Sequence, residues 1–108
     1  SGCPVGIVEV FNTDARIEQV EIGYTILPSL QGRGYGKAAV RTLTGYLLNE
    51  CDVNRVIATV HVENLPSQKL LNSNGFTKEG VLREGAFWQG IGFVDICLFS
   101  RLKRDEEM

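Results

Sequence analysis

Apolar residues change their spacing several times along the chain, and each change predicts a new element. The run from Val5 to Phe11 is β-branched and aromatic, which favours a strand, and the polar cluster from Asn12 to Asp14 favours a turn after it. Between Arg16 and Leu27 apolar residues return at every second position, which predicts a second strand paired with the first as a hairpin. From Lys37 to Cys51 the apolar period lengthens to about 3.6 residues, which predicts an amphipathic helix.

The second half of the chain predicts a strand, a helix and two further strands. The segment from Asn54 to Val62 is short, apolar and β-branched, and the helix before it predicts that it runs parallel to the preceding strand. Asn64 is placed to open a second helix, and Gly75 to end it in the left-handed conformation that a helix exit needs. Two late strands are expected, from Phe76 to Glu84 and from Phe93 to Leu102.

Length, charge and cysteine content narrow the class of protein. The 108 residues, of which 44% are hydrophobic and 22% charged, fit one globular domain. The 11 Lys and Arg residues against 13 Asp and Glu give a net charge of -2 without a basic stripe, which argues against a nucleic-acid partner. The apolar stretches are far shorter than the ~20 residues that span a bilayer, and no signal peptide is visible, so no membrane partner is expected. The three cysteines include no C-x-x-C pair, which predicts reduced thiols in a cytoplasmic protein and no metal site. The charged segment from Arg101 to Met108 is expected to be frayed.

A glycine-rich turn, Gln31 to Gly36, joins the second strand to the first helix. Its glycines let successive backbone N–H groups approach a phosphate, and Arg33 and Lys37 add positive charge beside them. A nucleotide P-loop would need Ser or Thr where this chain has Ala38, and the dinucleotide fingerprint would need a different glycine spacing. The pattern that remains is Q-x-x-G-x-G directly after a strand.

This turn and the second helix together resemble the GNAT superfamily of acetyl-CoA-dependent N-acetyltransferases, whose pyrophosphate-binding turn reads Gln/Arg-x-x-Gly-x-Gly/Ala. Asn64, Ser67 and Gly75 stand at the matching spacing in the second helix. The segment from Glu79 to Glu84 and the later Asp95 are similar to the branch that contains ribosomal-protein N-terminal alanine acetyltransferases. The resemblance covers essentially the whole chain.

The resemblance implies a fold and a cosubstrate. The fold is an α/β domain with a twisted mixed sheet of about five strands, antiparallel at both ends, whose central parallel pair splays and on which the helices pack. The cosubstrate is acetyl-CoA, with its pyrophosphate held by the glycine-rich turn and its pantetheine arm bonded by Asn64. The implied activity is transfer of the acetyl group to a primary amine, either a protein N-terminus or a small amine, by direct attack in a ternary complex. The residues expected to bind acetyl-CoA are Ile26, Leu27, Gln31, Gly32, Arg33, Gly34, Tyr35, Gly36, Lys37, Asn64 and Ser67.

The proton transfers of this reaction need a base and an acid. Glu21, on the strand beside the expected thioester, is the catalytic base that we favour, because an amine must lose a proton to attack. Glu18, Glu63 and His61 are alternatives, although a lone histidine in an apolar strand is more often a core residue. The tyrosine that protonates the leaving thiolate in many relatives is matched here by Leu71, so the proton would come from water.

Three aromatic residues near the late strands have two possible roles. We interpret them as core between these strands, with an acceptor pocket as the alternative: Trp88, Phe87 and Phe93. The family fold has a further strand and two helices before the first hairpin, so the single domain of residues 1–108 is expected to be N-terminally incomplete. An unpaired strand edge near Val5 then predicts a homo-oligomer or completion by an N-terminal segment. A non-catalytic acyl-CoA-binding or interaction module is the alternative to an enzyme.

Overall fold

The structure, a computed structural model, describes residues 6–14, 16, 18–26 and 35–107. Each strand and helix expected from the pattern of apolar residues is present within this part of the chain. In order they are β1 (Gly6–Asp14), β2 (Gln19–Ile26), α1 (Tyr35–Glu50), β3 (Arg55–His61), α2 (Leu65–Ser73), β4 (Thr77–Trp88), β5 (Gly92–Leu102) and the short 3-10 helix η2 (Lys103–Glu107). No helix in the described part of the chain is long and apolar enough to cross a membrane.

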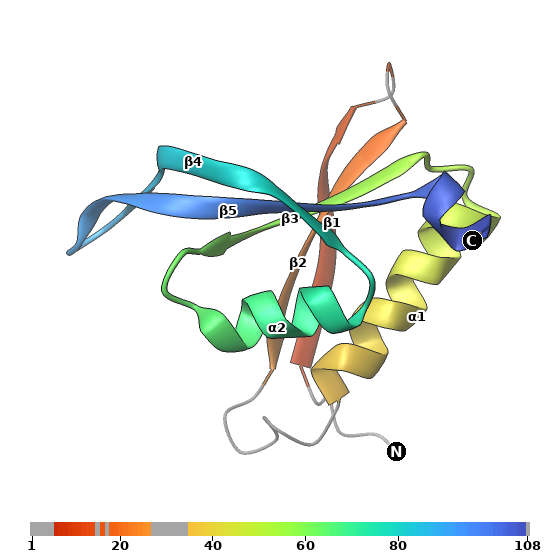
Figure 1. The fold of residues 1–108 in the computed structure, drawn as a ribbon, viewed down its shortest axis with the longest axis horizontal. Helices are drawn as coiled ribbons and strands as arrows, with labels where there is room; N and C mark the ends of the chain where they lie inside the picture. Colours follow the sequence, from red (N-terminus) through yellow and green to blue (C-terminus); the bar gives the residue numbers. More distant parts are fainter. Residues whose placement is uncertain (1–5, 15, 17, 27–34, 108) are drawn as a thin grey trace.

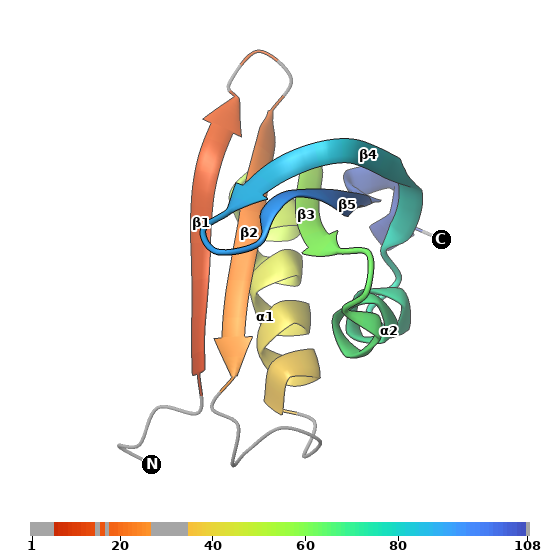
Figure 2. The same cartoon turned by 90° about the vertical axis from the view of Figure 1, so that its left-hand side faces the viewer.

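The strands form one mixed sheet in the order β1-β2-β3-β5-β4 (Figure 1). Its parallel pair is β2 with β3, and the pairs on either side of it are antiparallel. The parallel pairing runs only from Gln19 opposite Arg55 to Glu21 opposite Ile57, although both strands continue well beyond these residues. Figure 2 shows the consequence, because β2 continues beside β1 while β3 turns toward α2. The splayed central pair is therefore confirmed.

One core joins the sheet to both helices. Val20 and Val56 on the two central strands are buried in the same cluster as Val40 of α1 and Leu71 of α2. Since side chains alternate between the two faces of a strand, the neighbours of Val20 and Val56 lie on the face away from this core. The remaining members of the cluster are Ile22, Leu47, Leu48, Ala58, Phe76, Cys97 and Phe99.

The end of the chain corrects the expectation of a frayed tail. β5 continues to Leu102, and η2 follows it directly. The Arg101 guanidinium donates a hydrogen bond to the Gly75 carbonyl at 2.9 Å, and the backbone N–H of Lys103 donates to the Asn54 carbonyl at 2.9 Å. The charges of this segment suggested that water surrounds it, whereas the Arg101 guanidinium and the Lys103 backbone bind carbonyls of distant segments.

The β4–β5 hairpin corrects the expectation that its aromatic residues fill the core. β4 extends to Trp88, so the hairpin projects to one side beyond the helices (Figure 1). Phe87, Trp88 and Phe93 are 61%, 43% and 67% exposed, because no described element covers the end of the hairpin. The Phe87 and Phe93 rings contact each other edge to face, with centroids 5.2 Å apart.

Candidate active site

The central feature of the site is the fork at which β2 and β3 stop pairing. Glu21 belongs to the last pair, opposite Ile57, and its half-buried side chain lies on the face away from the helices. The Thr59 hydroxyl donates a hydrogen bond to Glu21 Oε2 at 3.2 Å. This bond orients a carboxylate at the fork, where the two backbones begin to diverge.

Thr59 was not among the residues expected from the sequence. It follows Ile57 at the next position on the same face of β3, so alternation puts it on the side of Glu21 once the register of the parallel pair is known. The two residues are 38 positions apart in the chain. The sequence contains the alternation but not the register, which explains why this partner was missed.

The N-terminus of α1 lies at the end of the sheet toward which β2 runs (Figure 1). Ile26 is the last residue of β2, and Tyr35 is the first residue of α1. Gly36 is buried in the first turn, while Lys37 is exposed. The first turn of a helix has unpaired backbone N–H groups and a positive dipole end, as a pyrophosphate site requires. The other expected binding residues of this connection lie outside the described residues: Leu27, Gln31, Gly32, Arg33 and Gly34.

Asn64 caps the N-terminus of α2. Its Oδ1 atom accepts a hydrogen bond from the backbone N–H of Ser67 at 3.2 Å, and its own backbone N–H donates to the His61 carbonyl at 2.9 Å. A helix cap is a structural role that the resemblance did not supply. The Nδ2 group of Asn64 has no partner among the residues that the structure describes, so the same side chain keeps a donor for a ligand.

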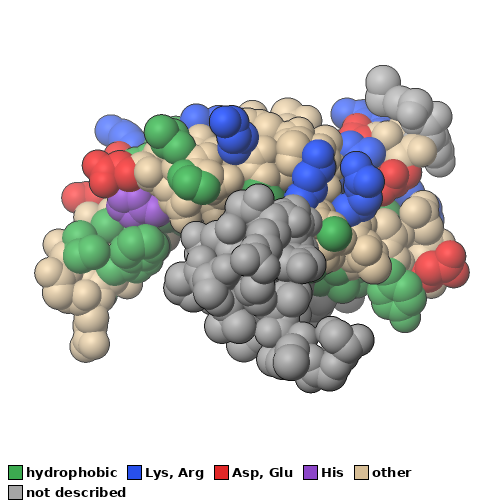
Figure 3. All heavy atoms as spheres, turned by 90° about the horizontal axis from the view of Figure 1, so that it is seen from below, with side chains coloured by type: hydrophobic (Ala, Val, Ile, Leu, Met, Phe, Trp, Pro, Cys, Tyr) green, Lys and Arg blue, Asp and Glu red, His purple; other side chains and the backbone are tan. Residues whose placement is uncertain are grey.

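His61 ends β3 and lies between the fork and the hairpin. It is half-buried and does not belong to the core cluster, which corrects the expectation of a core histidine. Its Nδ1 atom accepts a hydrogen bond from the backbone N–H of Glu63 at 3.0 Å, so the neutral ring carries its proton on Nε2. The Trp88 ring lies 4.9 Å away between centroids, and Figure 3 shows the histidine beside exposed hydrophobic side chains.

Neither Glu18 nor the position of Leu71 supplies a proton-transfer group at the fork. Glu18 lies in the turn before β2 with a φ of 49°, and its carbonyl accepts hydrogen bonds from the backbone N–H groups of Asn54 and Arg55. It is therefore at the opposite end of β2 from Ile26, which corrects its placement on the same strand as Glu21. Leu71 is fully buried in the core, so the position matched to the family's tyrosine offers no proton donor.

A polar network lies on the same side of the sheet as Glu21. Arg55 donates hydrogen bonds to Gln19 Oε1 at 2.7 Å and to Glu79 Oε2 at 2.5 Å, which connects β2, β3 and β4. The hydrogen bond from Arg55, followed by one from Ser100, lowers the pKa of Glu79 below its ordinary value of 4.5. These hydrogen bonds hold the Arg55 and Glu79 side chains in place on this face, but they do not extend to Glu21 at the fork.

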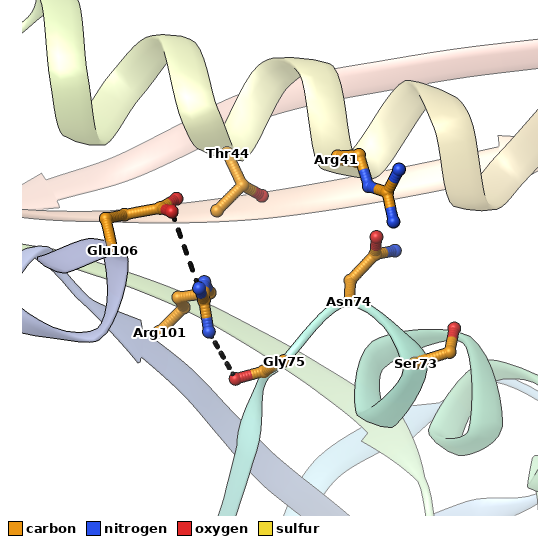
Figure 4. A pocket seen from close by; sticks show the side chains of 7 residues that line it. All are labelled: Arg41, Thr44, Ser73, Asn74, Gly75, Arg101 and Glu106. Atoms are coloured by element: carbon orange, nitrogen blue, oxygen red, sulfur yellow. Dashed lines mark hydrogen bonds and ion pairs between the residues drawn. The ribbon is translucent and has the colours of Figure 1, made fainter. Parts of the chain in front are cut away.

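A separate cavity of about 370 Å³ lies between α1, the end of α2 and the end of the chain (Figure 4). The lining residues are Arg41, Thr44, Ser73, Asn74, Gly75, Arg101 and Glu106. None of them is among the expected acetyl-CoA or catalytic residues. The structure, over its described residues, also contains no group of three or more His, Cys, Asp or Glu side chains that could hold a metal ion.

Known proteins resemble this chain in both sequence and fold. The family model "Acetyltransferase (GNAT) domain" matches residues 1–77. The "Uncharacterized N-acetyltransferase p20" of Bacillus licheniformis is 41% identical over 87 residues, which are 81% of this chain and 48% of the relative. The "Putative ribosomal N-acetyltransferase YdaF" of Bacillus subtilis (strain 168) is 34% identical over 106 residues, which are 98% of this chain and 57% of the relative.

A solved structure shows the same fold. The ribosomal-protein-S5-alanine acetyltransferase from Vibrio fischeri superposes with a TM-score of 0.88 at 25% identity, over 94% of this chain and 55% of that one. The chain thus spans about half the length of the curated relatives that it matches. The matching family model, the identity to N-acetyltransferases and the splayed sheet agree, and the chain belongs to the GNAT family of N-acetyltransferases.

Proposed function

We propose that the protein transfers an acetyl group from acetyl-CoA to a primary amine, and that the reaction takes place at the fork between β2 and β3. The observation that carries the proposal is the end of parallel pairing at Glu21, which leaves two backbones to diverge beside a carboxylate. Ligands of open α/β sheets enter at such a place, outside the carboxyl ends of the strands. Family membership supplies the class of reaction.

The residues at the fork fit acetyl-CoA in three respects. The N-terminus of α1 offers unpaired N–H groups to the pyrophosphate, Lys37 adds a positive charge, and Asn64 keeps an Nδ2 donor for the pantetheine arm. When bound, acetyl-CoA supplies the activated acetyl thioester. The other proposed binding residues are those implied by the family resemblance: Ile26, Leu27, Gln31, Gly32, Arg33, Gly34, Tyr35, Gly36 and Ser67.

Glu21 acts as the base in this proposal. Its carboxylate, oriented by Thr59, takes a proton from the ammonium form of the acceptor, and the neutral amine then attacks the thioester carbonyl. The new bond joins the amine nitrogen to the acetyl carbon, the bond to sulfur breaks, and the nitrogen releases its surplus proton to water. Leu71 offers no proton, so the departing thiolate takes one from water.

The acceptor is proposed as a protein N-terminus or a small amine. Two of the similar proteins carry ribosomal proteins in their names, which makes a peptide with a free N-terminus the first acceptor to assay. The second candidate function, a non-catalytic acyl-CoA-binding module, draws its support from Leu71, because the family's usual proton donor is missing.

Release of free thiol from acetyl-CoA distinguishes the two functions. The full-length protein is assayed with a panel of peptides and polyamines, and acetylated products are identified by mass spectrometry. Turnover with at least one amine supports the enzyme. Tight binding of CoA by calorimetry without turnover on any acceptor would favour the binding module, and absence of CoA binding would reject both.

A further inference from the structure

The cavity of about 370 Å³ between α1, the end of α2 and η2 has the features of a second ligand site (Figure 4). Its volume falls in the range of about 300 to 1,000 Å³ that is usual for small-molecule sites. Asn74 lines it at the C-terminal end of α2, whereas Asn64 and Ser67, which we assign to acetyl-CoA, lie at the N-terminal end of the same helix. At a helix rise of about 1.5 Å per residue, Asn64 and Asn74 are roughly 15 Å apart, so the cavity lies apart from the proposed acetyl-CoA site.

Two guanidinium groups make this cavity positive. Arg41 of α1 forms no ion pair with any residue that the structure describes. Arg101 of β5 donates to the Gly75 carbonyl at 2.9 Å, while its contacts with the Asp105 carbonyl and the Glu106 carboxylate are long, at 3.4 Å. Since a guanidinium has five N–H donors, Arg101 is held in place and still has donors for a ligand. Among the described residues that line the cavity, Glu106 alone is acidic, so the lining has a net positive charge.

A buried hydroxyl group also lines the cavity. Thr44 of α1 is 3% exposed, and its Oγ1 atom has no hydrogen-bond partner in the part of the chain that the structure describes. Figure 4 shows this hydroxyl turned toward the side of the cavity where Arg41 and Asn74 lie. A buried polar group without a partner destabilises a fold. An acceptor atom of a bound ligand would give the Thr44 hydroxyl its partner.

The Asn74 amide presents an acceptor to the same cavity. Its Nδ2 group donates to the carbonyls of Lys37 and Leu70, each at 3.3 Å, which fixes the orientation of the amide. The Oδ1 atom at the other end is buried, and it has no partner among the described residues. An amide oxygen accepts hydrogen bonds but donates none, so a ligand that satisfies Asn74 must bring a donor.

Together these groups favour an anion that carries one proton. Arg41, Arg101 and Thr44 offer donors to acceptor oxygens, and Asn74 accepts from a donor. A carboxylate or a sulfate ion at neutral pH supplies acceptors only, whereas hydrogen phosphate supplies both kinds of group. We propose that the cavity binds a phosphate group that keeps one proton, either as inorganic phosphate or as a small phosphomonoester. The cavity is larger than one phosphate ion, so the organic part of a phosphomonoester also fits.

Calorimetry with three anions measures this site directly. Inorganic phosphate, sulfate and glycerol phosphate are titrated into the protein at constant ionic strength in a buffer without phosphate. Phosphate is expected to bind at one site per chain and about tenfold more tightly than sulfate, because sulfate leaves the Asn74 oxygen without a donor. Tighter binding of glycerol phosphate than of inorganic phosphate would identify a phosphomonoester as the ligand, and the reverse order would identify the free ion.

Three substitutions should change the phosphate affinity in stated directions. Arg41→Gln removes a charged donor and should weaken binding by about tenfold or more. Thr44→Val removes the hydroxyl but keeps the shape, so it should weaken binding by about threefold or more without lowering the stability to urea. Glu106→Gln removes the carboxylate that competes for Arg101 and should strengthen binding by about threefold. Arg83→Gln, the same change as at Arg41 but at an exposed arginine of β4, is the matched control and should bind phosphate as the parent does.

A titration in the presence of CoA tests whether the two sites are separate, and this arm alone rests on the proposed function. The Lys37 carbonyl that accepts from Asn74 belongs to the first turn of α1, where we propose that the pyrophosphate binds. The two ligands would therefore be neighbours without overlapping. Phosphate should bind to the CoA-saturated protein, and Arg41→Gln should bind CoA as the parent does. If the protein binds no CoA, the proposed function fails, while the titrations without CoA still decide whether the phosphate site exists.

Four results would overturn the proposal. A protein without saturable phosphate binding has no such site. Sulfate that binds as tightly as phosphate shows that Asn74 takes no proton from the ligand. Equal losses in Arg41→Gln and Arg83→Gln show a general attraction to positive charge. Competition between phosphate and CoA, with loss of the preference for CoA over its 3′-dephospho form in Arg41→Gln, shows that the cavity holds the 3′-phosphate of CoA instead of a separate ligand.

Discussion

Glu21 is the residue on which the proposed chemistry depends. Glu21→Gln is expected to lower kcat by roughly 100-fold or more near neutral pH, because the amide accepts no proton from the acceptor. Activity should recover partly at high pH, where the free amine accumulates without a base. The measurement is kcat against pH for the full-length protein and its variant.

Glu18→Gln is the matched control for this prediction. It makes the same chemical change in the turn directly before β2, and its pH profile should coincide with that of the parent. If the Glu21→Gln profile instead runs parallel to that of the parent, Glu21 is not the base.

Asn64 combines two roles that substitutions can separate. Asn64→Ala removes the helix cap and the ligand donor together, so it should lower the free energy of unfolding by about 1 kcal/mol and also weaken CoA binding. Asn64→Ser keeps a capping oxygen but lacks the Nδ2 donor. It should retain the stability of the parent and still lose roughly 0.5 to 1.5 kcal/mol of CoA affinity.

Calorimetry with CoA and with its 3′-dephospho form checks where Asn64 acts. Loss of affinity should be equal for the two ligands, since the proposed contact is on the pantetheine arm. A variant that loses its preference for the 3′-phosphate would show that Asn64 lies elsewhere along the ligand.

At the scale of elements, the Arg55–Glu79 pair connects β3 to β4 and makes stability depend on pH. Arg55 lowers the pKa of Glu79 in the folded protein, so this carboxylate stabilises the fold above its ordinary pKa and loses the effect as the pH falls through the lower, folded value. The parent should therefore exceed Glu79→Gln in stability near pH 7, and the difference should shrink on acidification below about pH 4 to 5.

Urea unfolding of dilute parent and variant between neutral and acidic pH measures this difference. Because the Glu79 side chain is 33% exposed, solvent screens the pair and the difference is expected to be modest. A difference that grows toward acidic pH would contradict the direction of the pKa shift.

At the scale of the whole molecule, the residues expected to bind acetyl-CoA all lie within this chain, whereas its relatives are about twice as long. We expect the 108-residue chain to bind CoA by itself, and we propose that transfer to an acceptor also needs the additional segments that the longer relatives have. Calorimetry and thiol release are measured on the 108-residue chain and on a longer relative for comparison. Gly34→Asp should abolish CoA binding, because a carboxylate in the turn repels the pyrophosphate. Full transferase activity of the 108-residue chain would contradict the prediction that it binds CoA but does not transfer the acetyl group by itself.

The sequence by itself determined the order and type of the elements. Alternation predicts β2, a period near 3.6 predicts α1, and Asn64 and Gly75 predict the limits of α2, where the structure finds a cap and a φ of +80°. These features depend on neighbours within a few residues, so local patterns are sufficient for them. The splayed parallel pair came from the family resemblance and is confirmed by the register of β2 and β3.

Only the tertiary structure decided what covers a side chain and what it bonds. Phe87 and Phe93 are apolar enough for a core, but the hairpin that carries them projects past the helices and leaves them exposed. Arg101 is ordered by a carbonyl 26 residues away, and Thr59 meets Glu21 across 38 residues. Such contacts depend on strand register and on the placement of whole elements, and neither is encoded in the spacing of residues along one segment.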